Sequence, residues 1–590
     1  MINPSNDRLN YGNILTPPHN YKLDFAISAT YSLDLNSLIG ASISLGLNDD
    51  TDSDLMESEI YLLDALRKTS DKVALFCEAG QIQKPEKVTP FYILLEKMVY
   101  PVKTTKNINI TKYPSFHPKF WLLRFVNENN EFLYRTIVLS RNLTFNRNWD
   151  VSFVMDGVES SKTSKNNPLI NFLNYLSLHI KDYNKKEKIK EIMDSLHYVE
   201  FKLNSDEFKD FEFVVNGIDD ESDIKNQPLF KENFDEVLIM SPFLSSNIIK
   251  DFNERSSKNA KLMLFTHSSS LSKLKSEDCD KFDIYTLKDE VVDGESIISE
   301  NAQDFQKQDI HAKLYMTRKG NDVDLYLGSL NASHNAVYGN VEFMIRLKTT
   351  KKYLNINKLS RDLFNGSYED SECPFKLVDI NSYCDEAESD ENDLNSIIKE
   401  IIRKNPKAKI IHHNEKYNIQ VFTNAFNENI QISPLLVPEK KEKLTQKVCF
   451  KNLTKLQLCE FFTVSVKEND HEISRVIKIP CEDMPSDREN SLICDIINDE
   501  DSFIKYISFL LGDDFILSAL GIEKAGKDNF DFSTYAQSTA LYEKMLKAAY
   551  YQPEKFKDLE FIIKAVSDDG VIPEGFEGLY KTFKEVVYNG

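Results

Sequence analysis

One short pattern occurs twice in this chain of 590 residues, and no other feature constrains the fold as strongly. The first copy contains His117-x-Lys119, then Ser140-x-Asn142, and then an Asn-x-acid triplet that ends at Asp150. A single His-x-Lys arises by chance in many proteins. A second copy in the same order is much harder to assign to chance, and it would indicate an internal duplication.

The second copy lies almost two hundred residues further along the chain. It contains His311-x-Lys313, Ser329-x-Asn331 and a triplet that ends at Glu342. The His-to-Asn spacing is 25 residues in the first copy and 20 in the second, a difference that a longer hairpin turn explains. We therefore expect two related halves whose motifs occupy equivalent places.

The segments that precede each motif alternate between strand and helix patterns. In the first half we predict a buried helix over Tyr31–Leu47 and a strand over Val73–Gly80. In the second half, a strand over Val237–Ser245 precedes a helix and another strand. This order favours an α/β fold with two pseudo-symmetric lobes, each a sheet flanked by helices.

We expect four units along the chain. They are a first lobe at 1–160, a helical connector at 161–215, a second lobe at 216–384, and a C-terminal region at 385–590. An acidic link, SYCDEAESDENDLN, introduces the last unit. Alternating strand patterns follow it and then helical ones, so we expect a β-then-α docking or regulatory module.

The composition excludes several classes of protein. The net charge of −21 argues against a protein that coats nucleic acid with a globally basic surface, so a polyanion must meet a local basic site or be delivered by a partner. The eight cysteines form no Cys-x-x-Cys pair, so we expect no structural zinc and no disulfide framework. Neither a signal peptide nor a membrane span is recognised, which favours a cytoplasmic protein.

The residue types in the motif suit phosphodiester cleavage without a metal or another cofactor. His and Lys two apart on an extended segment point to the same side, and the Asn of the paired strand can reach the same point. Lysine and asparagine donors would stabilise the phosphate oxygens. One imidazole would attack phosphorus and the other protonate the leaving oxygen, with Asp150 and Glu342 as candidates to orient the rings. The symmetry leaves open which His does which.

These motifs, with runs such as FHPKFWLLRF and GNVEFMIRL, resemble the phospholipase D superfamily over about residues 21–347. The resemblance implies an active site at the seam of the lobes, His117 as nucleophile, His311 as general acid and no metal. It further implies a bacterial nuclease acting on DNA through a phosphohistidine, with a partner such as a helicase in a defence system. A homo-oligomer stays open.

The sequence departs from the superfamily pattern at three positions. Arg124 and Arg318 stand where the family has Asp, and Leu139 replaces the Gly of the first Gly-Ser-x-Asn. Loss of the Asp also marks the tyrosyl-DNA phosphodiesterase branch, so the departures favour nucleic acid over lipid. Phospholipid phosphodiesterase and a silent nucleic-acid-binding scaffold remain the alternatives. We expect both arginines to be structural.

Other candidates have simpler expected roles. At least one of Phe120 and Trp121 should be a core residue, although either could stack a base. We expect surface, capping or otherwise non-catalytic positions, without metal, for His179, His197, His334, His412 and His413.

Overall fold

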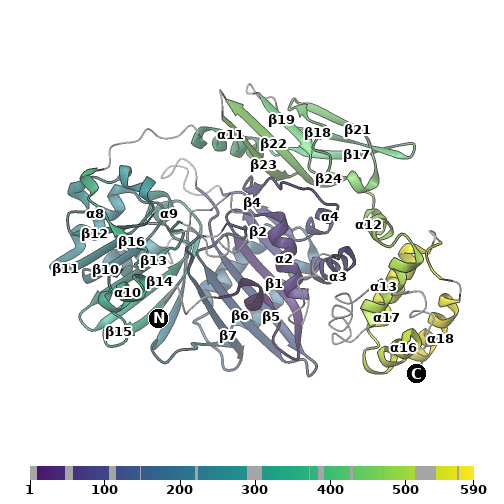
Figure 1. The fold of residues 1–590 in the computed structure, drawn as a ribbon, viewed down its shortest axis with the longest axis horizontal. Coiled ribbons are helices and arrows are strands. Elements are labelled where there is room, and N and C mark those ends of the chain that lie inside the picture. The colour runs from purple at the N-terminus through teal and green to yellow at the C-terminus, as the bar shows by residue number, and fades with distance from the viewer. Residues whose placement is uncertain are drawn as a thin grey trace.

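The structure, a computed structural model, describes most of the chain (Figure 1). The described residues are 9–46, 58–104, 114–146, 148–218, 223–288, 309–370, 373–382, 391–424, 429–468, 471–511, 540–567, 570–573 and 575–589. Among them no helix combines the length and the apolar character needed to cross a membrane.

The first lobe is built on a seven-stranded mixed sheet. Its order is β4 (Val99–Val102), β2 (Val73–Glu78), β1 (Tyr21–Thr30), β5 (Phe120–Asn127), β6 (Phe132–Leu139), β7 (Ser152–Glu159) and β8 (Val199–Lys202). The strands β1, β2 and β4 run parallel, and β5 to β8 continue the sheet in antiparallel fashion. The central parallel strand β2 is buried along its whole length, as expected for a sheet covered on both faces.

The second lobe repeats this arrangement strand for strand. Its order is β16 (Phe375–Leu377), β12 (Phe282–Leu287), β11 (Ser256–Phe265), β10 (Phe234–Met240), β13 (Leu314–Lys319), β14 (Asp322–Gly328), β15 (Glu342–Thr350) and β9 (Asp210–Asn216). Again three strands are parallel and the following ones antiparallel. Only β16 has no counterpart in the first sheet, so the two-lobed α/β fold predicted from the duplicated motif is confirmed.

Helices pack against both sheets. Those of the first lobe are α1 (Tyr11–Leu15), α2 (Leu35–Gly46), α3 (Glu59–Ser70) and α4 (Tyr92–Leu95), and those of the second are α7 (Pro228–Lys231), α8 (Ser246–Arg255), α9 (His334–Tyr338) and α10 (Ile356–Leu363). The predicted helix at 31–47 begins only at Leu35, because Ser32 and Leu33 bond to the loop after β2.

The stretch expected to be a helical connector has a mixed structure. It contains α5 (Asn167–Ser177) and α6 (Tyr183–Leu196), but then supplies β8 and most of β9. These two strands are consecutive in the chain and each closes the edge of a different sheet. The connector is therefore built into both lobes.

One hydrophobic core joins the two lobes across the connector. Phe120 and Phe343 lie with ring centroids 4.5 Å apart, and Phe172 of α5 packs 4.9 Å from Phe343. Trp121 is also fully buried and donates from Nε1 to Tyr11 Oη at 2.7 Å. Phe120 and Trp121 are thus both core residues, and neither is free to stack a base.

The C-terminal region begins with α11 (Glu391–Arg403) and two sheets, seen in green above the first lobe in Figure 1. One sheet has the order β21 (Lys447–Leu453), β18 (Lys416–Phe422), β17 (Lys407–His413) and β24 (Cys481–Glu482). The other has β20 (Glu442–Lys443), β19 (Ile430–Pro434), β22 (Phe461–Glu468), β23 (His471–Lys478) and β3 (Ile82–Gln83). The last strand comes from the first lobe, so this sheet joins the two units.

The chain ends in helices, as predicted. They are α12 (Arg488–Ile496), α13 (Glu500–Leu511), α16 (Ala540–Tyr551), α17 (Lys555–Val566) and α18 (Phe576–Asn589). They share a core with α2 and α3, and Arg67 of α3 donates to Tyr506 Oη at 2.8 Å. The C-terminal region is therefore packed on the first lobe over both its β and its α parts.

The two arginines at the family's Asp positions have structural roles. Arg124 is buried and donates to Asp24 at 2.6 Å and to Glu191 at 2.8 Å. Arg318 lies 3.0 Å from Glu236 and 3.3 Å from Asp235. Because carboxylates hold both side chains on β5 and β13, they tie neighbouring elements together within each lobe.

Candidate active site

Each His-x-Lys motif lies directly before the strand on which it was predicted. The strand β5 begins at Phe120 and β13 at Leu314, so both motifs occupy the extended segments that lead into them. The lysines still form backbone hydrogen bonds with the neighbouring strands: Leu139 N donates to Lys119 O, and Gly328 N donates to Lys313 O. The motifs therefore end up at the seam between the lobes.

At this seam each lobe pairs with the other through its backbone. His117 N donates to Val341 O at 2.9 Å, and His311 N donates to Trp149 O at 2.9 Å. Short parallel bridges join Phe116 to Val341 and Trp149 to Ile310. The backbone of His117 is thus held beside Val341, the residue before Glu342. The backbone of His311 is held in the same way beside Trp149, the residue before Asp150.

The orienting carboxylates consequently cross between the lobes. His117 Nδ1 lies 3.0 Å from Glu342 Oε2, although the two residues are 225 positions apart. Ser329 donates to the same oxygen, and Asn340 Nδ2 donates to Oε1 at 3.1 Å. Two neighbours of its own lobe therefore hold Glu342 against the other lobe's imidazole.

The second pair is the mirror of the first. His311 Nδ1 lies 2.9 Å from Asp150 Oδ1, and Ser140 Oγ donates to that oxygen at 2.7 Å. With the ring proton on Nδ1, each imidazole would donate to its carboxylate and keep the Nε2 lone pair available. The predicted carboxylates do lie behind the rings, and each belongs to the opposite lobe.

Burial and charge keep both imidazoles neutral in the unliganded site. Burial, then the charges of Lys119 and Lys313, lower the pKa of His117 well below its ordinary value. Burial and the charge of Lys313 lower the pKa of His311 to about 4, although Asp150 acts in the opposite direction. A bound anion would oppose the lysine charges and favour the protonated ring.

The side chains of Lys119 and Lys313 are both buried beside the histidines of their motifs. Lys119 Nζ lies 3.1 Å from His117 Nε2 and is fully buried, while Lys313 Nζ donates to the carbonyl of His311. Burial, followed by the charge of Lys313, lowers the pKa of Lys119 well below its ordinary value. Burial lowers the pKa of Lys313 to about 8. Two lysines buried this deeply favour the binding of an anion, because it would stabilise their charged forms.

The carboxylates differ in ionisation. Burial raises the pKa of Glu342 to about 8, although Lys119 and the hydrogen bonds from Ser329 and Asn340 act to lower it. Burial also acts to raise the pKa of Asp150, but the hydrogen bond from His311 and the charge of Lys313 bring it below its ordinary value. An ionised partner stabilises imidazolium and a neutral one does so less. His311 is therefore better suited to carry a proton than His117.

The two motif asparagines differ in their hydrogen bonds. Asn142 Oδ1 accepts from Ser32 N at 3.4 Å. Asn331 is 6% exposed, and its Oδ1 has no hydrogen-bond partner among the described residues. A buried oxygen without a partner is costly, so this group is positioned to accept a bond from a ligand or water.

A further group beside His117 was not predicted from the sequence. Glu78, at the end of β2, accepts from Phe116 N at 2.8 Å, and Tyr31 lies with its ring centroid 5.0 Å from that of His117. Lys399 of α11 lies 3.5 Å from Glu78 Oε1 and donates to Ser115 Oγ at 2.9 Å. The C-terminal region thus reaches the segment that carries His117, and no motif signals it.

The other histidines singled out from the sequence make different contacts, and one of them has an unexpected position. His334 begins α9 and bonds to Asn247, His197 caps α6, and His412 packs on Tyr417 in the C-terminal sheet. His179 was expected to face solvent, but it lines a cavity beside α5. Within the described ranges, no group of three or more His, Cys, Asp and Glu side chains is arranged to hold a metal ion.

Comparisons with known proteins find similarity only at the level of structure. No family model and no curated protein matches the chain. Yeast tyrosyl-DNA phosphodiesterase is 15% identical, with a TM-score of 0.36, and covers 59% of this chain and 87% of its own. Phosphatidylserine synthase from Haemophilus influenzae is 10% identical, with a TM-score of 0.34, and covers 67% of this chain and 89% of its own. Because these similarities are low, we argue function from the geometry of the site.

Proposed function

We propose that this protein is a metal-independent phosphodiesterase, a nuclease that cleaves DNA through a phosphohistidine intermediate. The observation that carries this proposal is the pair of crossed His–carboxylate contacts, with two buried lysines, at one seam. The lysines supply the positive charge that a phosphodiester needs, and the rings supply a nucleophile and an acid.

In the first step, His117 Nε2 attacks phosphorus and the bond from phosphorus to the leaving oxygen breaks. His311, protonated once the anionic substrate is bound, gives its proton to that oxygen. The lysines would stabilise the charge on the nonbridging oxygens in the pentavalent transition state. The products are a free hydroxyl on the leaving strand and the other strand joined through its phosphate to His117 Nε2.

In the second step, neutral His311 takes a proton from water, and the resulting hydroxide attacks phosphorus. The bond from phosphorus to His117 Nε2 breaks, which releases a phosphomonoester and restores both rings. We assign the acid role to His311 because its partner, Asp150, stays ionised, whereas Glu342 holds its proton more tightly.

Local positive charge supports a nucleic-acid substrate. Lys103, which follows β4, lies at the contact with α11, and Lys399 of α11 reaches the segment before His117. Arg475 of β23 is close enough to Tyr31 to lower its pKa, against the larger effect of burial. Lys103 and Lys399 both lie where α11 contacts the first lobe, and there they would attract a phosphate backbone.

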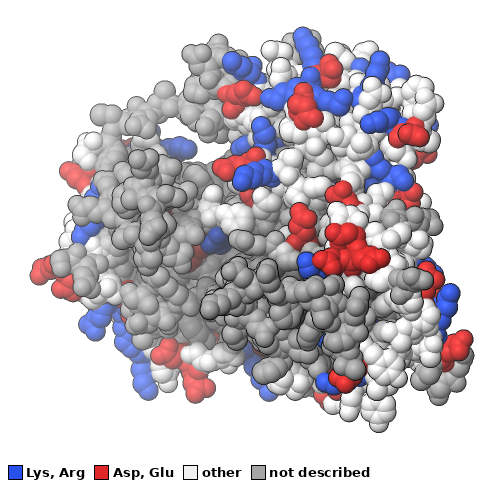
Figure 2. All heavy atoms as spheres, turned by 45° about the vertical axis from the view of Figure 1, so that its right-hand side comes forward, with Lys and Arg blue, Asp and Glu red and all other residues white. Residues whose placement is uncertain are grey.

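The rest of the described surface offers less positive charge for binding DNA. Over the described part of the face in Figure 2, basic side chains alternate with acidic ones, in keeping with the net charge of −21. We therefore also propose that a partner, such as a helicase of a bacterial defence system, presents the DNA. Cleavage would then be slow on free DNA and faster with the partner.

The test is a cleavage assay in EDTA on single-stranded DNA, double-stranded DNA, RNA and phosphatidylcholine. We expect cleavage of DNA that is lost in His117→Ala and in His311→Ala. His412→Ala is the matched control, because this exposed histidine lies on the C-terminal sheet.

Three outcomes would overturn the proposal. Cleavage that survives both substitutions would remove the assigned site, and cleavage abolished by EDTA would remove the metal-independent mechanism. Turnover of phosphatidylcholine alone would identify a lipid phosphodiesterase instead.

A further inference from the structure

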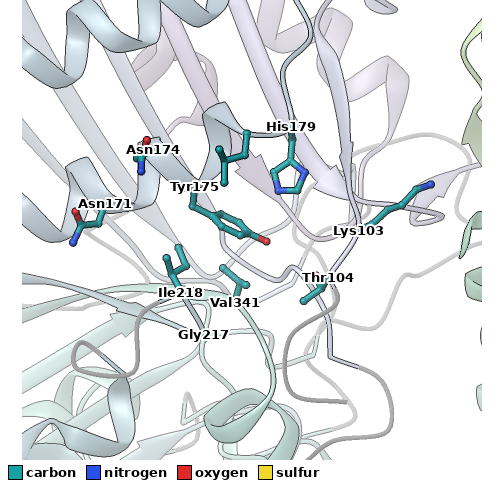
Figure 3. A pocket seen from close by; sticks show the side chains of 10 residues that line it. Lys103, Thr104, Asn171, Asn174, Tyr175, His179, Gly217, Ile218 and Val341 are labelled. Carbon is teal, nitrogen blue, oxygen red and sulfur yellow. The ribbon is translucent and has the colours of Figure 1, made fainter. Parts of the chain in front are cut away.

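A cavity of about 530 Å³ lies between α5 and the seam of the lobes (Figure 3). Its size is within the range of small-molecule sites, and such sites often occur where domains meet. Its lining residues are Lys103, Thr104, Asn171, Asn174, Tyr175, Leu178, His179, Gly217, Ile218 and Val341.

This cavity is adjacent in structure to the His117–Glu342 pair. Val341 immediately precedes Glu342, and its carbonyl accepts the backbone N–H of His117. Phe116, the residue before His117, stacks on Tyr175 with ring centroids 6.4 Å apart. A ligand in the cavity would therefore contact the backbone bridge that positions the proposed nucleophile.

The cavity presents polar groups that the described protein does not satisfy. Thr104 Oγ1 is buried without a hydrogen-bond partner among the described residues. Within the same described part, the side chains of Asn171 and Asn174 make no hydrogen bond, and both lie on the exposed face of α5. In Figure 3 the hydroxyl of Tyr175 points into the space between Lys103, His179 and Val341. An unpaired buried hydroxyl is costly, which favours a ligand that bonds to it.

The lining also limits the charge of such a ligand. Lys103 is the one lysine, arginine or carboxylate side chain among the described lining residues, and its Nζ is held by Ile402 O at 3.0 Å and Asn405 Oδ1 at 2.6 Å. Burial lowers the pKa of His179, which keeps that ring neutral. The cavity therefore suits an uncharged group.

We propose that this cavity binds a nucleobase of the substrate strand next to the scissile phosphate, which deepens and rests on the proposed nuclease function. Carboxamides pair with base edges that carry both a donor and an acceptor, and the rings of Tyr175 and His179 offer faces for stacking. Their centroids lie 5.2 Å apart in an edge-to-face arrangement, so one ring can stack while the other borders the base.

The first experiment measures binding of nucleoside monophosphates to the full chain by calorimetry, with ribose 5-phosphate as the probe that lacks a base. We expect the nucleotides to bind and ribose 5-phosphate to bind at least about tenfold more weakly, since stacking and base-edge bonds would supply the difference. The double variant Asn171→Ala/Asn174→Ala should lose about tenfold in nucleotide affinity. Asn167→Ala, an exposed asparagine on the same helix outside the lining, is the matched control.

The second experiment separates this inference from the nuclease proposal. It compares kcat/KM for an oligonucleotide with kcat/KM for bis(4-nitrophenyl) phosphate, a diester without a nucleobase. In the double variant we expect the ratio of the two constants to fall about tenfold. An unchanged ratio, or equal binding of ribose 5-phosphate, would overturn the nucleobase site. Nucleotide binding at these residues without any diester cleavage would overturn the nuclease function and leave the nucleobase site in place.

Discussion

Replacing Lys399 by Met removes the partner of a buried carboxylate and should make stability strongly dependent on pH. Glu78 is 4% exposed, and burial raises its pKa to about 7, with Lys399 as the largest opposing influence. A carboxyl group whose pKa is raised in the folded state binds its proton more tightly there. Its ionisation therefore lowers stability as the pH rises from about 4.5, the unfolded value, through the folded value.

The size of the effect follows from this shift. A rise from 4.5 to about 7 corresponds to about 3 kcal/mol lost at alkaline pH even with Lys399 present. Without Lys399 the carboxylate would be buried unpaired, and we expect a further loss of about 3 kcal/mol at pH 8.5. At pH 5.5 Glu78 is protonated in both proteins, so the loss should be about 1 kcal/mol, mainly the bond to Ser115.

The assay is urea denaturation of the wild type and Lys399→Met at both pH values. Lys404→Met is the control, because Lys404 immediately follows the same helix and pairs with exposed Glu400. Adding Glu78→Gln to Lys399→Met should restore stability at pH 8.5, since it removes the unpaired charge. An equal loss at the two pH values, or no rescue by Glu78→Gln, would refute this reasoning.

Three other predictions concern the seam and the buried Arg124. Asp150→Asn should lower kcat at least about 100-fold at pH 7, whereas Glu342→Gln should lower it less than about tenfold, because Glu342 already tends to be neutral. Steady-state kinetics would check this, and equal losses would contradict the assigned roles. Because burial lowers the pKa of Lys313 to about 8, kcat/KM should fall above that pH, and Lys313→Arg should remove this alkaline limb from a pH profile. Arg124→Leu should cost about 3 kcal/mol in urea denaturation with unchanged kcat per folded molecule; a selective loss of kcat would place Arg124 in the active site.

The lobes could be predicted from the sequence because the duplication preserves the order of the motifs and the spacing within each His-x-Lys. Residues two apart on an extended segment share a side, so His117 and Lys119 had to lie together, and the same holds for His311 and Lys313. The repeated strand order follows from the repeated pattern of strands and helices. These features depend on local periodicity, which a single sequence contains.

The crossed carboxylates could not be predicted in the same way. Contacts across 225 and 161 positions depend on how the lobes dock, and no local pattern encodes that docking. Likewise β3 is two residues long, too short for a recognisable alternation, yet it joins the first lobe to the C-terminal sheet. Lys399 lies on an amphipathic helix with an ordinary mixture of charges, so its contact with Glu78 appears only in three dimensions.

The phosphohistidine is the most direct test of the proposed mechanism. His311→Asn retains His117 but lacks both the acid of the first step and the base of the second. With an oligonucleotide whose scissile ester has 4-nitrophenolate as the leaving group, the first step needs no acid, so the intermediate should accumulate. After brief exposure to this substrate and denaturation in alkali, which preserves phosphohistidine, mass spectrometry should locate the strand joined through its phosphate to His117. A phosphoryl group on His311 of the wild type, or turnover without any phosphohistidine, would contradict the account.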